Sequence, residues 1–384
     1  MNQNVSANVR NHEAKARIKN RTTWLFAVTV ALYAVFGEMP CADADGFLPT
    51  QVSTVPPNGD VNPYGVAFIP EGFRHGAGSL RPGDILVSNF NNNMNLQGTG
   101  TTIVRVTASG SVSTFFAGPP HPGGSPGLGL STALAVLRHG FVIVGNVPSI
   151  DGTCGTATLG SLLVIDNMGN QVSTISDSNI NGPWDMAVLD EGNHAVAFIS
   201  NVFAGTVLRV NLNIDTNGVT VVNETVIASG YQQRCDPTAF VVGPTGLVYD
   251  RNRDVLFVAS TEDNAVFAVH HAATRNNSGG TGTVIYTDAV HLHGPLGMAE
   301  APNGHLLVSN SDVINPDPTQ PSEIVEFTKQ GQFVKQLSVD PAQGGSFGLA
   351  VNVVEDTSFF AAVDDNTATL TIWKIPVEDL IPPF

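Results

Sequence analysis

A short phrase recurs six times along the chain, and this repeat constrains the fold more than any other feature of the sequence. Each copy has a small or turn residue, an apolar stretch, a turn and a strand that ends in a polar residue, as in GPLGMAEAPNGHLLVSN. The small or turn positions of the copies are Gly65, Ala133, Asp185, Gly246, Gly297 and Gly348. Their spacings of 68, 52, 61, 51 and 51 residues indicate a repeat protein built from equivalent supersecondary units.

Two more strand-like segments follow each of the first five copies, so a repeat has four strands. Four strands per repeat is the pattern of a β-propeller blade. The sixth copy is followed only by TLTIWKI, and the segment 47–55 (FLPTQVSTV) can supply its missing outermost strand. Closure by this segment would remove exposed sheet edges. We therefore predict an all-β protein, a six-bladed β-propeller closed by its N-terminal strand.

Composition agrees with one large β domain. The 384 residues include 39 Gly and 24 Pro, 42% of them are hydrophobic and only 13% are charged. This balance excludes a disordered chain, and the frequent turn residues exclude a helical bundle. We expect residues 45–384 to form a single propeller domain.

Residues 1–44 have the pattern of a signal peptide. A basic stretch precedes the apolar run Trp24–Phe36, and Ala42-Asp43-Ala44 has the small-x-small form of a cleavage site. An uncleaved N-terminal anchor is the alternative. We expect an exported protein, periplasmic or extracellular, with no membrane span after cleavage.

The net charge excludes nucleic acid as a partner. It is −16 for the whole chain and −18 without residues 1–44, which leaves 12 basic and 30 acidic residues. A field of this sign repels phosphates and favours cations or neutral polar ligands.

Two cysteines, Cys154 and Cys235, remain in the exported part of the chain. In an oxidising compartment such a pair usually forms a disulfide. Propeller geometry places both on the face where the central channel opens, and we predict a bond that crosses blade 3. Two free thiols are the alternative.

Polar residues end the second strand of each repeat. In a propeller these positions surround the mouth of the central channel, together with the residues that precede each inner strand. The set comprises Asn89, Asn146, Asn201, Thr261 with Glu262, Asn310, and Asp364 with Asp365. Such a ring offers oxygen ligands to a hard cation and donors and acceptors to a polar organic molecule. Alternatively, the repeated Asn caps the backbone at strand ends and is a feature of the repeat alone.

His291-Leu292-His293 precedes the inner strand of blade 5. In an extended segment residues two apart face the same side, so both imidazoles would point together near the mouth. A general base or a pair of metal ligands is one interpretation, and ordinary polar packing is the other.

The repeat phrase resembles that of NHL-type six-bladed propellers, whose copies begin with P-x-G-[ILV]-A. It is more loosely similar to the gluconolactonase-like and paraoxonase-like propellers. That second resemblance implies a divalent cation held in the mouth by a Glu, Asn residues and an Asp, here Asn146, Asn201, Glu262 and Asp364. In the first blade, Asn62-Pro63-Tyr64 stands where those families place a ligating Glu.

Two functions follow from these patterns, and whether the protein is an enzyme stays open. The first is an exported binding protein, acting as a monomer, that holds a small polar ligand or a protein partner through Asn89, Asn310 and His291. The second is a metal-dependent hydrolase or lyase, lactonase-like, with His293, Glu262 and Asp364 as catalytic residues. Calcium is the cation we expect if one is bound, and we expect no other cofactor.

Overall fold

The computed structural model describes residues 49–119, 128–311, 313–316 and 323–377. The predicted signal peptide, residues 1–44, lies outside them, so its fate stays a prediction. By its internal contacts the chain divides into the units Met1–Gly46 and Phe47–Phe384, and the second holds the repeats. No helix among the described residues is long and apolar enough to cross a membrane.

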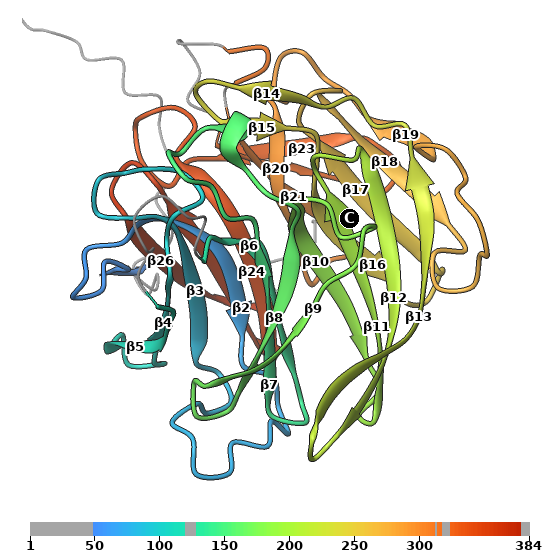
Figure 1. Cartoon of the computed structure of the whole chain (residues 1–384). Coiled ribbons are helices and arrows are strands. Elements are labelled where there is room, and N and C mark those ends of the chain that lie inside the picture. Colours follow the sequence, from blue (N-terminus) through green and yellow to red (C-terminus); the bar gives the residue numbers. More distant parts are fainter. Residues whose placement is uncertain (1–48, 120–127, 312, 317–322, 378–384) are drawn as a thin grey trace, which may run out of the picture. The chain divides into compact units, whose positions relative to one another are not determined.

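The second unit is a six-bladed β-propeller, as the repeat predicts (Figure 1). Each blade is a sheet of four antiparallel strands, which are named below in order from the channel outward. Blade 1 has β2 (Val61–Phe68), β3 (Ile85–Asn91), β4 (Thr102–Val106) and β5 (Val112–Ala117); blade 2 has β6 (Leu130–Leu137), β7 (Phe141–Asn146), β8 (Ser161–Asp166) and β9 (Gln171–Ile175); blade 3 has β10 (Pro183–Asp190), β11 (His194–Asn201), β12 (Thr206–Asp215) and β13 (Gly218–Ser229).

The other three blades follow the same order from the channel outward. Blade 4 has β16 (Pro244–Asp250), β17 (Val255–Ser260), β18 (Ala265–His270) and β19 (Thr283–Tyr286); blade 5 has β20 (Pro295–Glu300), β21 (Leu306–Asn310), β22 (Ile324–Phe327) and β23 (Phe333–Leu337); blade 6 has β24 (Ser346–Val354), β25 (Thr357–Asp364), β26 (Thr369–Pro376) and β1 (Thr50–Ser53).

The N-terminal strand closes the ring. Strand β1 pairs antiparallel with β26, and Val52 lies opposite Leu370. The side chain of Asn89, from blade 1, donates a hydrogen bond of 3.1 Å to the carbonyl oxygen of Thr54, just after β1. The first and last parts of the propeller are therefore joined both within blade 6 and across to blade 1.

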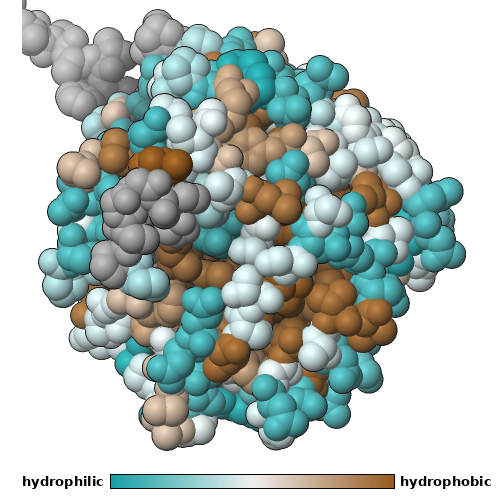
Figure 2. Space-filling model, in the orientation of Figure 1, coloured by the Kyte–Doolittle hydropathy of each residue, from teal (hydrophilic) through white to brown (hydrophobic). Residues whose placement is uncertain are grey.

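A separate apolar core lies between each pair of neighbouring blades. Leu134 and Leu86, for example, belong to the cluster between blades 1 and 2, whereas Phe198 and Leu256 belong to that between blades 3 and 4. The outermost strands are the most exposed, and Val112, Val172 and Val222 lie on three of them. Figure 2 shows apolar residues gathered toward the middle of one face, with hydrophilic residues around them.

Glycine recurs on the inner strands because neighbouring strands approach closely around the channel. A β-carbon on Gly297 would lie 2.1 Å from the carbonyl oxygen of Phe347, and one on Gly348 would lie 1.8 Å from that of Tyr64. Both distances are far below van der Waals contact. Glycine at these two positions is thus required by the packing of the inner ring.

Two short elements lie outside the blades. The hairpin of β14 (Arg234–Asp236) and β15 (Phe240–Val242) connects blades 3 and 4. The 3₁₀ turn η1 (Cys154–Thr156) lies between β7 and β8. Figure 1 shows the hairpin at the upper end of the propeller.

Candidate functional site

A cavity of about 190 Å³ lies at the mouth of the channel, where inner strands begin and second strands end. We call it the mouth cavity. Its lining comes from blades 1, 3, 4, 5 and 6 and from the hairpin β14–β15: Asn62, Tyr64, Phe90, Gln97, Trp184, Thr238, Ala239, Val241, Val242, Thr261, Leu296, Ser311, Val313, Gly344, Phe347 and Asp365. Thr261 and Asp365 belong to the set expected around the opening from the repeat.

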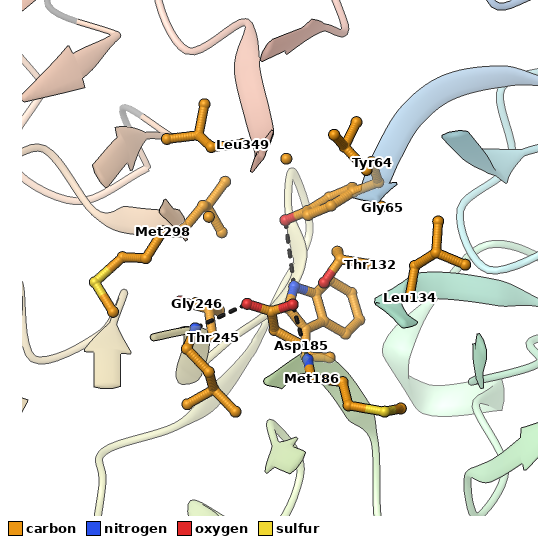
Figure 3. A pocket seen from close by; sticks show the side chains of 16 residues that line it. Tyr64, Gly65, Thr132, Leu134, Asp185, Met186, Thr245, Gly246, Met298 and Leu349 are labelled. Atoms are coloured by element: carbon orange, nitrogen blue, oxygen red, sulfur yellow. Dashed lines mark hydrogen bonds between the residues drawn. The ribbon is translucent and has the colours of Figure 1, made fainter. Parts of the chain in front are cut away.

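Three residues form the floor of the mouth cavity. Tyr64, Trp184 and Leu296 also line a second cavity, of about 90 Å³, inside the channel. The Nε1 of Trp184 donates a hydrogen bond of 3.2 Å to the Tyr64 hydroxyl, as Figure 3 shows. Burial raises the pKa of Tyr64 far above its usual value, so the phenol stays protonated. The three side chains separate the mouth cavity from the channel below.

Aromatic rings form most of the apolar wall. Phe347 stacks on Tyr64 with ring centroids 4.5 Å apart, and Phe90 meets Tyr64 and Trp184 edge to face at 5.9 and 5.3 Å. Phe240, from the hairpin, stacks on Trp184 at 6.3 Å. These contacts form an apolar layer across the mouth that is distinct from the cores between blades. Mutual packing fixes the rings in place before any ligand binds.

The disulfide holds the hairpin over this layer. Cys154 and Cys235 are bonded, with their Cα atoms 5.7 Å apart, as predicted. The bond joins η1 of blade 2 to β14, and the same hairpin contributes Ala239 and Val241 to the cavity wall. Gln97 of blade 1 also reaches the hairpin, because its Nε2 donates a 2.7 Å hydrogen bond to the carbonyl oxygen of Thr238.

Two polar side chains in the mouth cavity have unused hydrogen-bonding capacity. Asn62 is 7% exposed and adopts a left-handed backbone conformation with φ of 57°. Its Oδ1 has no hydrogen-bond partner among the described residues. Among the described residues, none donates a hydrogen bond to the carboxylate of Asp365. Burial, aided by the charge of Asp364, raises the pKa of Asp365 to about 6. An unpaired buried acceptor such as the Asn62 Oδ1 is costly, and the partly exposed Asp365 carboxylate is an acceptor at the edge of the same cavity, so the two groups favour a ligand that donates hydrogen bonds.

Asp185 is the acidic group of the channel. It occupies the repeat position at which four blades have glycine. Its oxygens accept hydrogen bonds of 2.8 Å from the backbone N–H groups of Met186 and Leu247 (Figure 3). Burial raises its pKa to about 7, because loss of water outweighs these two hydrogen bonds. Asp185 therefore ties blade 3 to blade 4 at the channel wall.

The repeated Ser-Asn pair at the end of the second strand shapes the backbone. Ser88, Ser200 and Ser309 each accept a hydrogen bond from the backbone N–H at the small position of their own inner strand, at 2.8–3.1 Å. In blades 2, 3 and 5 the amide Oδ1 of the Asn that ends the second strand accepts an N–H from the loop that enters the inner strand, whereas the buried Oδ1 of Asn89 in blade 1 has no partner among the described residues. These bonds link Asn146 to Gly129, Asn201 to Asn181 and Asn310 to His293, at 2.8–3.0 Å.

These amides therefore have a structural use that does not require a ligand. Asn89 and Asn310, expected as ligand-binding residues, and Asn146 and Asn201, expected as metal ligands, do not line the mouth cavity. Asn89 bonds to the closing segment, and the Nδ2 of Asn146 donates to the hydroxyl of Ser161 at 3.1 Å. Their roles toward a ligand or cation stay predictions.

The three expected catalytic residues do not line the mouth cavity. Glu262 forms an ion pair with Arg234 of the hairpin at 2.9 Å. His293 is fully buried, and its Nε2 lies 3.0 Å from the carbonyl oxygen of Val290. Asp364, also fully buried, accepts hydrogen bonds from the backbone N–H of Asn366 and the hydroxyl of Thr367. A shared catalytic role for them stays a prediction.

His291 and His293 have different contact partners. The segment that contains them is a turn and not an extended strand, so the alternation of faces does not apply. His291 stacks on Phe333 with centroids 3.8 Å apart, and its Nδ1 lies 2.5 Å from the Asp288 carboxylate. Its role as a ligand-binding residue stays a prediction.

Two further acidic residues, Glu323 and Asp340, lie near Asp364. Burial and the neighbouring Asp340 raise the pKa of Glu323 to about 9, and burial likewise raises the pKa of Asp364. Glu323 is therefore protonated at neutral pH. Among the described residues, no three His, Cys, Asp or Glu side chains form a group suited to holding a metal ion.

Sequence reasoning missed Asn62, Tyr64 and Trp184 as site residues. All three stand at or just inside the start of an inner strand, and the first two belong to the Asn62-Pro63-Tyr64 segment, which departs from the pattern of the propellers that the repeat resembles. This departure was the available signal, but the aromatic layer joins residues of five separate segments and leaves no contiguous motif.

No family model matches the chain, and a search of curated proteins finds no match. Solved structures do match, at low identity. An α-L-arabinofuranosidase from Fusarium graminearum is 13% identical with a TM-score of 0.52, over 87% of this chain and 99% of the other. A calcium-binding regucalcin from Agrobacterium tumefaciens is 12% identical with a TM-score of 0.47, over 84% and 92%. A proposed gluconolactonase is 12% identical with a TM-score of 0.45, over 86% and 95%. These similarities extend to the fold alone, and membership of the NHL family stays a prediction.

Proposed function

We propose that the chain is an exported binding protein that holds a small organic molecule in the mouth cavity. The observation that carries this proposal is Asn62, a side chain more than nine-tenths buried that lines the cavity and whose Oδ1 has no partner among the described residues. A buried acceptor without a donor is expected where a ligand supplies the donor. The volume equals that of about six waters, at about 30 Å³ each, and suits a small ligand.

The rigid surroundings support a binding role. The floor is fixed by the Trp184–Tyr64 hydrogen bond, and the hairpin wall is fixed by the disulfide. A preformed site loses little conformational entropy on binding. A disulfide at the mouth also agrees with the oxidising compartment expected from the signal peptide.

Ligand-induced thermal stabilisation tests the proposal. The mature protein is screened against sugars, lactones, amines, carboxylates and divalent cations. Two variants are screened beside it. Ala239→Trp fills the cavity from the hairpin wall, and the control Ala108→Trp adds the same side chain to an exposed turn between β4 and β5. We expect at least one organic compound to stabilise the wild type and the Ala108→Trp variant but not the Ala239→Trp variant.

The same screen separates the two functions. A stoichiometric cation that is required for turnover of a lactone or ester would favour the metal-dependent hydrolase or lyase. The binding proposal fails if no organic compound gives a stabilisation that Ala239→Trp removes.

A further inference from the structure

The charges and acceptors of the mouth cavity define the class of ligand that would fit there. Asp365 is the single charged residue among the residues described as lining it, and no Lys, Arg or His contributes. Arg234 of the hairpin is paired with Asp236 and Glu262 instead. An anionic ligand would meet Asp365 without a cation to balance it, in a protein whose net charge is already strongly negative.

Both unused polar groups of the cavity accept hydrogen bonds. They are the Asn62 Oδ1, which is buried without a partner among the described residues, and the carboxylate of Asp365, which is partly exposed. The two groups come from blades 1 and 6, which are neighbours in the ring. The backbone N–H of Asp365 is already bonded to the carbonyl oxygen of Gly345 at 2.7 Å, so this residue presents only acceptors. A ligand group with several N–H donors and a positive charge matches the two acceptors, whereas a hydroxyl has one donor.

The apolar wall of the cavity suits the same class of ligand. Tyr64 and Phe347, which line the same cavity as Asn62 and Asp365, stack on each other, and Phe90 and Trp184 extend the aromatic surface. Aromatic faces attract cations and pack against hydrocarbon or aromatic groups. An amine with a short apolar body would therefore contact both the two acceptors and the aromatic wall of the cavity.

We propose that the mouth cavity binds a small protonated organic amine, with its ammonium group between Asp365 and Asn62 and its apolar body on the Tyr64–Phe347 rings. This inference rests on the proposed function. It adds the ligand class and the two residues that select it.

Three probes of similar shape and different charge test the inference by calorimetry: benzylamine, benzyl alcohol and benzoate. We expect benzylamine to bind the wild type most tightly and benzoate not to bind. Asp365→Asn should weaken benzylamine at least tenfold and leave benzyl alcohol within about twofold, because the substitution removes the charge and keeps the shape. Asn62→Gly suits the left-handed backbone and should weaken benzylamine as well.

The matched control is Asp356→Asn. It removes one negative charge from an exposed turn between β24 and β25. It should leave benzylamine affinity unchanged, and circular dichroism should show native structure in all variants.

The outcomes separate the two levels of the proposal. The amine inference is wrong if benzyl alcohol or benzoate binds as tightly as benzylamine in a manner that Ala239→Trp removes. It is also wrong if Asp365→Asn and Asp356→Asn weaken benzylamine equally. The binding function itself fails only if neither these probes nor the wider screen gives binding that depends on the cavity.

Discussion

At the residue scale, Asp185 shows how one departure from the repeat changes the chemistry of the channel. Its carboxyl group replaces glycine and satisfies the N–H of Leu247 on the neighbouring blade. Burial raises its pKa from the ordinary aspartate range to about 7, so the folded state binds a proton that the unfolded chain releases. This stabilising contribution is complete below the unfolded pKa and is lost as the pH rises through about 7.

We therefore predict a pH-dependent effect of Asp185→Asn. The wild-type Tm minus the variant Tm should be larger at pH 5 than at pH 8, by a few degrees, because only the wild type carries this titration. Thermal unfolding of both proteins at the two pH values measures it. A difference that is constant with pH would show that the Asp185 carboxyl is not perturbed.

Asn146 tests the two interpretations of the repeated Asn. Its amide bonds to Gly129 and Ser161, so Asn146→Ala should cost about 1–2 kcal/mol of stability. If this amide only caps the backbone at the strand end, the loss of stability should be equal in the presence of calcium and in the presence of a chelator. Urea unfolding under both conditions makes the comparison. A calcium-dependent stabilisation of the wild type that the variant lacks would instead assign Asn146 to a metal site.

At the element scale, the hairpin β14–β15 matters most for the site and was not predicted. Each of its strands has three residues, too short for an alternating pattern to show. Phe240 begins β15 in a left-handed conformation with φ of 68°, which sequence patterns do not predict for a bulky residue. The disulfide that anchors this hairpin was predicted, because only two cysteines remain once a leader is removed.

We predict that the double variant Cys154→Ser, Cys235→Ser loses both stability and ligand affinity. The bond spans 81 residues, and the chain-entropy model assigns about 4–5 kcal/mol to a loop of this size. Its loss should also loosen the hairpin wall, so binding of the cavity ligand should weaken. Urea unfolding and calorimetry measure the two effects. Equal affinity in the double variant would show that the aromatic layer holds the hairpin without the bond.

At the scale of the whole molecule, the architecture could be predicted because every blade repeats the same local signals. The glycines at 297 and 348 and the Ser-Asn pairs at 200–201 and 309–310 recur for backbone reasons that act in several blades. The lining of the mouth cavity could be predicted only in part. Thr261 and Asp365 belong to the polar strand ends expected around the opening, whereas Asn62 and Trp184 come from other blades and carry no repeated signal that marks them as lining residues.

Closure itself gives the last prediction. Strand β1 is the outer strand of blade 6, and Asn89 of blade 1 bonds to Thr54 immediately after it. A chain that starts at Pro56 would leave β26 with an unpaired edge and Asn89 without this acceptor. Compared with a chain that starts at Phe47, it should unfold at lower temperature and self-associate through the open edge.

A peptide with the sequence of residues 47–55 provides the control. Added in trans to the shortened chain, it should pair with β26 and restore part of the lost Tm, whereas a scrambled peptide should not. Differential scanning calorimetry and light scattering follow both effects. If the chain that starts at Pro56 is as stable and as monodisperse as the longer one, the ring is closed by contacts between blades 1 and 6 and does not depend on β1.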